Sequence, residues 1–98
     1  MVTIVYRVVT KSGQADAFKK LASHVLIPEA QKSSGCRLFS LFQNAGNQRE
    51  FIFYEKWDSQ QNILAYKKRL IALLGDPHPG EEFPARMNDL IDEDEDLV

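Results

Sequence analysis

The sequence predicts an α+β fold of the ferredoxin-like class, an antiparallel sheet with helices on one face. Three observations lead to this class. Runs rich in β-branched and aromatic residues alternate with amphipathic segments in the order strand, helix, strand, strand, helix. A short turn-forming segment joins the second strand to the third. The chain has 98 residues, which suits a single domain over residues 1–98 with one modest core.

The first strand and the first helix are indicated by two different periodicities. Val2–Val9 is dense in β-branched residues and predicts a strand with apolar side chains on both faces. From Gln14 to about Ile27, apolar residues recur at spacings of three and four, which is typical of a helix that buries one stripe. Pro28 has no backbone N–H, so the helix should end or kink near Ile27.

A hairpin should form the centre of the sheet. Its strands are expected at Cys36–Gln43 and Glu50–Trp57, because both runs are rich in aromatic and aliphatic residues. The segment Asn44–Gln48, NAGNQ, has the composition of a turn. Two strands joined by so short a connection pair in an antiparallel way.

The second helix should begin at Ser59 or Gln60 and run to about Leu74. Asp58 is the expected N-cap, because Gln61 stands three residues later and completes the spacing of a capping box. The glycines and prolines that follow Leu74 break the helix.

The C-terminal part of the chain gives weaker signals. Glu82–Leu90 could form a further short helix. The run Asp92–Asp96 consists of five consecutive acidic residues, which repel one another and predict a solvated tail. We expect residues 92–98 to be dispensable for folding, unless Leu97 and Val98 add a strand to the sheet edge.

Composition excludes several classes of protein. The formal net charge of -2 gives no overall field that would attract nucleic acid. No apolar run is long enough to span a membrane, and the N-terminus has no signal-peptide pattern. Cys36 is the only cysteine, so no intrachain disulfide can form, and a cytoplasmic location is expected. Two distant histidines and one cysteine give no metal-ligand spacing, so no metal is expected.

Both faces of the predicted sheet are apolar. The third strand places Phe51, Phe53 and Trp57 on one face, and Ile52 and Tyr54 on the other. Helices can cover only one of these faces, and soluble monomers rarely expose a wide apolar patch. The economical arrangement is a two-fold homodimer, with a second copy packed sheet to sheet.

The run LIPEAQKSSGCRLFSLFQN, followed by REFIFYEKWDSQQNILAY, resembles the antibiotic biosynthesis monooxygenase (ABM) domain family. The resemblance covers about the first three quarters of the chain and implies a dimeric α+β barrel. The positions that match the family pattern are Ile27, Pro28, Gly35, Cys36, Phe51, Tyr54, Glu55, Trp57 and Ser59. The histidine that is frequent in the second helix of the family is replaced by Tyr66.

The resemblance implies a monooxygenase that oxidises a small quinol-like or polyphenolic aromatic substrate with dioxygen and without a cofactor. The Asn, Trp and His set of haem-degrading relatives has no match in this sequence, and no glycine-rich nucleotide loop is present. We therefore expect neither haem nor flavin. The alternative is a non-catalytic dimer of the same fold that binds a small ligand or has a structural role.

Six residues make up the expected site. Tyr66 and Glu55 are the candidate catalytic residues, as a hydroxyl donor and as a proton acceptor or partner of Arg7. Lys67 lies within the apolar stripe of its helix, where it could extend along the rim or point into a cavity. The candidate substrate-binding residues are Arg7, Trp57, Lys67 and Tyr6. For Arg7 an ion pair with Glu55 competes with an anion-binding role, and for Tyr66 and Trp57 packing in the core competes with chemistry.

Overall fold

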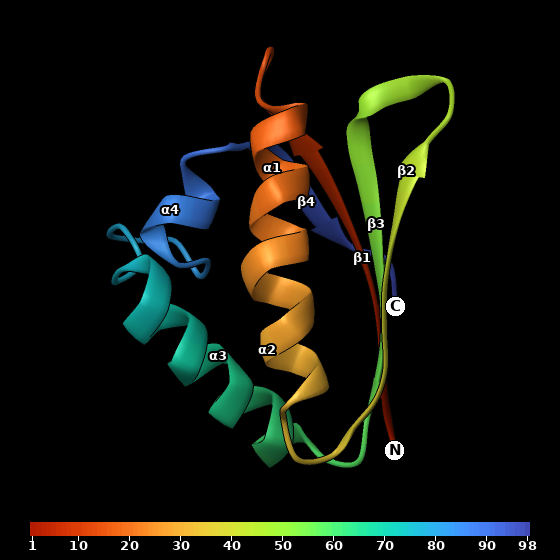
Figure 1. Ribbon diagram of the computed structural model, residues 1–98, viewed down its shortest axis with the longest axis vertical. Helices are drawn as coiled ribbons and strands as arrows, with labels where there is room; N and C mark the ends of the chain where they lie inside the picture. Colours follow the sequence, from red (N-terminus) through yellow and green to blue (C-terminus); the bar gives the residue numbers. More distant parts are fainter.

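The computed structural model describes residues 1–98 and shows one antiparallel sheet with the helices on one of its faces (Figure 1). The strand order is β2-β3-β1-β4, and all neighbouring strands are antiparallel, which confirms the ferredoxin-like fold class. The strands are β1 (Val2–Thr10), β2 (Cys36–Asn44), β3 (Asn47–Trp57) and β4 (Ile91–Asp96). The helical segments are α1 (Ala15–Leu21), η1 (Ala22–Leu26), α2 (Ile27–Gln31), α3 (Gln60–Leu74) and α4 (Ala85–Asn88).

The strand register decides which side chains meet on the helix-covered face. In the β1–β3 pair, Tyr6 lies opposite Phe53 and Ile4 lies opposite Glu55. Phe39 of β2 lies opposite Glu55 on its other side. Because side chains alternate along a strand, these five residues share one face of the sheet.

Aromatic packing fills the layer between the sheet and the first helix. Trp57 and Phe18 are both fully buried. The ring of Phe18 lies 4.9 Å from that of Phe51 and 6.0 Å from that of Phe53, centroid to centroid. Contacts at these separations add to the stabilisation that burial alone gives.

The first helix does not end at Ile27, and this part of its prediction is corrected. It widens into the single π turn η1 and continues as α2 to Gln31, so Figure 1 shows one nearly continuous helix. The π turn is closed by the Ile27 N–H, which donates to the Ala22 carbonyl five residues earlier. Pro28 follows at once, and it explains the widening because its ring would clash with the His24 carbonyl of a regular helix.

Helix α3 begins close to the predicted position, but its N-cap is Ser59 and not Asp58. The Ser59 hydroxyl accepts a hydrogen bond from the Asn62 N–H at 3.3 Å. Asp58 is instead bound by Arg37, whose Nε and Nη2 donate to its two carboxylate oxygens at 2.7 and 2.9 Å. None of the helices is both long and apolar enough to cross a membrane.

The acidic run is not a solvated tail, and this prediction is wrong. Residues Ile91–Asp96 form the edge strand β4, which pairs with β1 from Tyr6 to Thr10. Backbone hydrogen bonds hold the strand whatever its side chains are. Two arginines offset part of its charge, one on each face: Arg49 binds Asp92 at 3.0 Å and Arg7 binds Glu93 at 3.2 Å.

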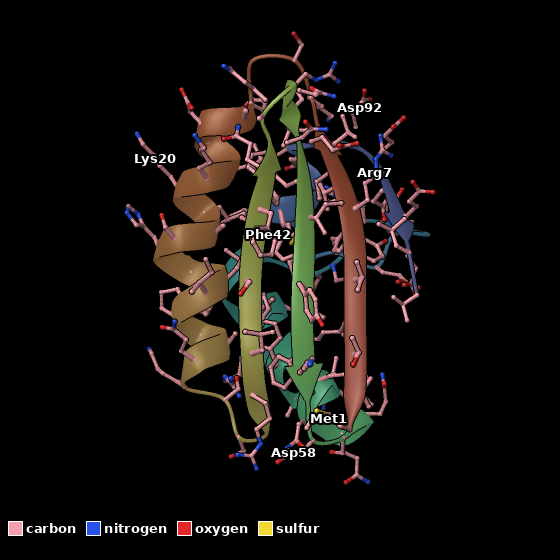
Figure 2. All side chains as sticks on the ribbon, turned by 90° about the vertical axis from the view of Figure 1, so that its right-hand side faces the viewer. Met1, Arg7, Lys20, Phe42, Asp58 and Asp92 are labelled. Atoms are coloured by element: carbon pink, nitrogen blue, oxygen red, sulfur yellow. The ribbon has the colours of Figure 1, made fainter.

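The face of the sheet that points away from the helices has no cover within the chain (Figure 2). Phe42 of β2 is 56% exposed and Leu38 is 39% exposed on this face. Val5, Ile52 and Tyr54 are half-buried on the same face. The prediction of an apolar open face is therefore confirmed, whereas the second copy proposed to cover it stays a prediction.

Candidate active site

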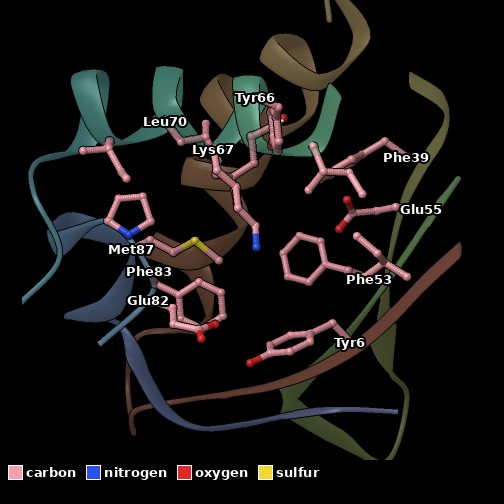
Figure 3. Close-up of a pocket in the computed structure, with 15 residues that line it drawn as sticks. Tyr6, Phe39, Phe53, Glu55, Tyr66, Lys67, Leu70, Glu82, Phe83 and Met87 are labelled. Carbon is pink, nitrogen blue, oxygen red and sulfur yellow. Dashed lines mark hydrogen bonds between the residues drawn. The ribbon is translucent and has the colours of Figure 1, made fainter. Parts of the chain in front are cut away.

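An apolar cavity of about 130 Å³, partly open to solvent, lies between the helix-covered face of the sheet and α3 (Figure 3). The loop between α3 and α4, together with the start of α4, closes the side away from β2. Eleven of its fifteen lining residues are hydrophobic. The lining residues are Ile4, Tyr6, Leu26, Phe39, Phe53, Glu55, Ile63, Tyr66, Lys67, Leu70, Ile71, Glu82, Phe83, Pro84 and Met87.

Glu55 is the carboxylate at the sheet side of this cavity. Strand β3 places it between the aromatic side chains of Phe53 and Trp57 on the same face. The Trp57 indole N–H donates to Glu55 Oε1 at 2.9 Å. Burial among apolar groups raises the pKa of Glu55, while the Trp57 hydrogen bond and the positive charge of Lys67 partly oppose the rise. Such a carboxyl group is suited to exchange a proton with a ligand.

Lys67 supplies the positive charge of the cavity. Its side chain extends from α3 with the ammonium group pointing into the cavity, as Figure 3 shows. No direct ion pair joins it to Glu55, so its donors are available to a ligand. Lys67 is also exposed to solvent, so it combines the two orientations that the sequence allows: it lies at the open rim and directs its ammonium group towards the cavity.

Tyr66 reaches the cavity with its ring, while its hydroxyl is already bound. The side chain is only 5% exposed, and the hydroxyl donates to the Leu26 carbonyl at 2.8 Å. Its ring packs against Trp57 at 5.2 Å and against Phe39 at 5.8 Å, between centroids. Burial raises the pKa of the Tyr66 phenol far above its ordinary value, which keeps the group neutral.

Tyr6 forms the part of the wall nearest to β4. Its hydroxyl donates to the Asp94 carboxylate, and its ring meets that of Phe83 edge to face at 5.6 Å. Burial, reinforced by the Asp94 hydrogen bond, raises the pKa of Tyr6. The side chain therefore joins β1, β4 and the α3–α4 loop around the cavity.

Arg7 lies outside the cavity, and the predicted pair with Glu55 is wrong. Its side chain is on the open face, where Nε donates to Glu50 Oε2 at 2.5 Å and Nη1 lies 3.4 Å from Glu95 Oε1. The cause is the alternation of side chains along β1, which puts Arg7 and its neighbour Tyr6 on opposite faces of the sheet. The β1–β3 register puts Glu55 on the same face as Tyr6, and therefore on the opposite face from Arg7.

Trp57 is fully buried and does not line the cavity. It touches the site through the hydrogen bond to Glu55. Of the six residues that the sequence analysis selects, the structure thus places four around the cavity: Tyr6, Glu55, Tyr66 and Lys67.

Sequence reasoning misses the wall contributed by the C-terminal third of the chain. Glu82, Phe83 and Met87 face the cavity from the α3–α4 loop and from α4. The loop is folded back by the hydrogen bond from the Ala85 N–H to the Gly75 carbonyl at 3.1 Å. The only signal in the sequence is Phe83, an isolated aromatic residue in a segment rich in glycine and proline. It does not indicate that the loop folds back over the cavity.

The structure defines a class of protein: a ferredoxin-like sheet and helix layer with a small apolar cavity between them, lined by two carboxylates and one ammonium group. The family model "Antibiotic biosynthesis monooxygenase" matches residues 1–71. The chain belongs to this family. No curated protein matches it.

Solved structures of similar fold come from several bacteria. A Nitrosomonas europaea protein titled "Putative antibiotic biosynthesis monooxygenase" shares 17% identity at a TM-score of 0.76, covering 97% of this chain and 84% of its own. A Pseudomonas aeruginosa protein shares 16% identity at a TM-score of 0.72, covering 95% and 85%. A Mycobacterium tuberculosis protein shares 17% identity at a TM-score of 0.69, covering 98% and 91%. At these identities the likeness shows the shared fold.

No group of three or more His, Cys, Asp or Glu side chains is placed to hold a metal ion. The charged groups that face the cavity are Glu55, Lys67 and Glu82. This arrangement can accept a proton, stabilise a neighbouring anion and surround a small apolar ligand with apolar side chains.

Proposed function

We propose that the protein is a cofactor-independent monooxygenase that oxidises a small quinol-like or polyphenolic aromatic compound with dioxygen. The observation that carries the proposal is the half-buried Glu55 carboxylate, with a raised pKa, in an apolar cavity that also receives Lys67. Membership of the antibiotic biosynthesis monooxygenase family supports the reaction class. The substrate class rests on the chemistry of the cavity and on the family resemblance.

Cavity size supports a substrate with one ring. An engineered protein cavity of about 150 Å³ lined by aliphatic and aromatic side chains binds benzene. The volume of about 130 Å³ found here is similar. A single ring with small substituents therefore fits inside the cavity, whereas part of a fused three-ring compound would extend beyond it.

The proposed reaction starts with transfer of the substrate hydroxyl proton to Glu55. The resulting phenolate, stabilised by the Lys67 ammonium, gives one electron to dioxygen. The phenoxyl radical and superoxide then combine into a peroxide on a ring carbon that carries hydrogen. Glu55 returns its proton to this peroxide.

Loss of the ring C–H proton then forms a carbonyl and breaks the O–O bond. The released hydroxide takes up that proton and leaves as water. One oxygen atom of dioxygen thus ends in the quinone product and the other in water. The chain supplies proton transfer, charge stabilisation and a largely apolar cavity, so the reaction as written uses no haem, flavin or metal.

The proposal includes a homodimer through the open sheet face and a cytoplasmic location. Exposed Phe42 and Leu38 support the homodimer, because a second copy would remove them from water. The lone Cys36 supports a reducing compartment. Small aromatic substrate and dioxygen are the proposed partners, and neither nucleic acid nor membrane is expected.

The test is oxygen uptake by the purified protein with catechols, hydroquinones and a three-ring phenol, each corrected for oxidation without enzyme. We expect turnover of one-ring compounds, reduced about 100-fold or more in Glu55→Gln. Glu81→Gln is the matched control, since it removes the same charge at an exposed position one residue from the cavity wall. Lys67→Met should also lose activity, whereas Lys68→Met, at a position that does not line the cavity, should not.

Two outcomes would contradict the proposal. Equal turnover in Glu55→Gln and the native protein would remove Glu55 as the proton acceptor. Binding of one-ring phenols without any oxygen uptake would instead favour the alternative, a non-catalytic ligand-binding protein of the same fold.

A further inference from the structure

We propose that Trp57 is a positioning residue that fixes the Glu55 carboxylate, with Tyr66 and the Leu26 carbonyl holding Trp57 in turn. The inference deepens the proposed function and rests on it for the role of Glu55 as proton acceptor. It also gives the two aromatic residues a part in the site that requires neither of them to touch a substrate proton.

The first step is the hydrogen bond between the strand neighbours. Trp57 and Glu55 stand two residues apart on β3, so both side chains point to the same face. The indole N–H, which has no access to water, donates to Glu55 Oε1 at 2.9 Å. A buried N–H without an acceptor is strongly disfavoured, so this bond should persist.

The second step concerns the other oxygen of the same carboxylate. Glu55 Oε2 receives no hydrogen bond from any group of the chain, although Glu55 lines the cavity. With Oε1 held by Trp57, Oε2 is the atom that can accept a hydrogen bond from a ligand hydroxyl. The carboxylate is thus held in one orientation rather than free to turn about its last torsion angle.

The third step is the support behind the indole. The Tyr66 ring lies 5.2 Å from Trp57 at an interplanar angle of 38°. Its hydroxyl is anchored on the Leu26 carbonyl at 2.8 Å, at the end of the π turn. A chain of contacts therefore runs from η1 through two aromatic rings to the carboxylate. Rotation of the indole away from Glu55 would break its hydrogen bond to the carboxylate and disturb its contact with the Tyr66 ring.

The sequence offers a sharp test, because Trp57 is the only tryptophan. Supplying 5-fluorotryptophan labels this position alone. Its fluorine NMR signal should titrate together with the carbon-13 carboxyl signal of Glu55. The fluorine titration should disappear in Glu55→Gln. A fluorine signal that does not follow the Glu55 titration would show that the bond is absent and would overturn the inference.

The second arm removes the donor and keeps the ring. Benzothienylalanine in place of tryptophan has sulfur where the indole has N–H, at nearly equal volume. We expect the pKa of Glu55 to rise, because the bond that favours its charged form is lost. Binding of catechol at neutral pH should weaken about 5- to 10-fold, the value of one hydrogen bond. Trp57→Phe should show the same direction if it folds.

A purely structural Trp57 would leave the Glu55 titration unchanged in the benzothienylalanine protein, and that result would overturn the inference. Failure of the proposed function would be seen in a different measurement. Native protein that binds catechol without oxygen uptake would refute the oxygenase, while the Glu55 titrations would still decide the role of Trp57.

Discussion

The Tyr66 hydroxyl should contribute more to stability than to chemistry, and Tyr66→Phe measures both. The substitution keeps the ring and removes the donor of a 2.8 Å hydrogen bond to the Leu26 carbonyl at a site that is 5% exposed. Such a bond contributes about 1–1.5 kcal/mol net, and the buried carbonyl left behind can add to the loss. For a domain of this size each 1 kcal/mol lowers Tm by about 4–8 °C. We therefore expect Tm to fall by about 5–12 °C.

Thermal and urea unfolding followed by circular dichroism provide the measurement. Tyr54→Phe is the matched control, because its hydroxyl has no hydrogen-bond partner within the chain, and its Tm should change little. If the Tyr66 hydroxyl instead stabilises the transition state, turnover should fall about 10- to 1000-fold at a temperature where the variant is folded. Equal Tm values for native and Tyr66→Phe protein would refute the structural assignment.

Three further predictions concern other parts of the molecule. Truncation after Ile91 should lower the free energy of unfolding by at least about 2 kcal/mol, because it removes the backbone bonds of β4; an unchanged urea midpoint would show that β4 is dispensable. Glu55→Gln should become increasingly stabilising as pH rises above about 4.5, the ordinary pKa of Glu, because the raised pKa penalises charged Glu55 in the folded state; parallel stability–pH curves for the two proteins would contradict this. Native protein should be dimeric in light scattering at micromolar concentration and Phe42→Glu monomeric, whereas a folded native monomer would refute the proposed interface.

Periodicity predicted the parts of the fold that depend on local pattern. The alternation of Phe51, Phe53 and Trp57 indicated β3 and placed these residues on one face, and the structure buries all three. Pro28 indicated an irregularity in the first helix, but only tertiary packing decides between an end and a π turn.

The site was harder to predict, for two physical reasons. The predicted pair of Arg7 and Glu55 was based on opposite charge alone. It did not consider that side chains alternate along a strand, which places Glu55 under α3 and Arg7 on the open face. The wall formed by Phe83 depends on how a loop folds back, which short-range patterns do not determine.

The acidic run showed a third limit. Repulsion within Asp92–Asp96 is real, but it could not be weighed without knowing that Arg7 and Arg49 lie beside the strand. The sequence shows that the cluster is negative. Which residues pair with it depends on the register between β4 and β1, two segments that lie far apart in the chain.

The acidic edge strand has a consequence for self-association. A second copy approaching β4 in antiparallel orientation would set carboxylates opposite carboxylates, and such pairs are destabilising. The charges of β4 therefore disfavour the addition of a further strand at this edge. The other edge strand, β2, lacks such an acidic run. This repulsion is electrostatic, and salt screens it: the Debye length falls from about 10 Å at 0.1 M salt to about 3 Å at 1 M. Concentrated salt should thus weaken the repulsion at this edge, whereas hydrophobic association through the open face should persist.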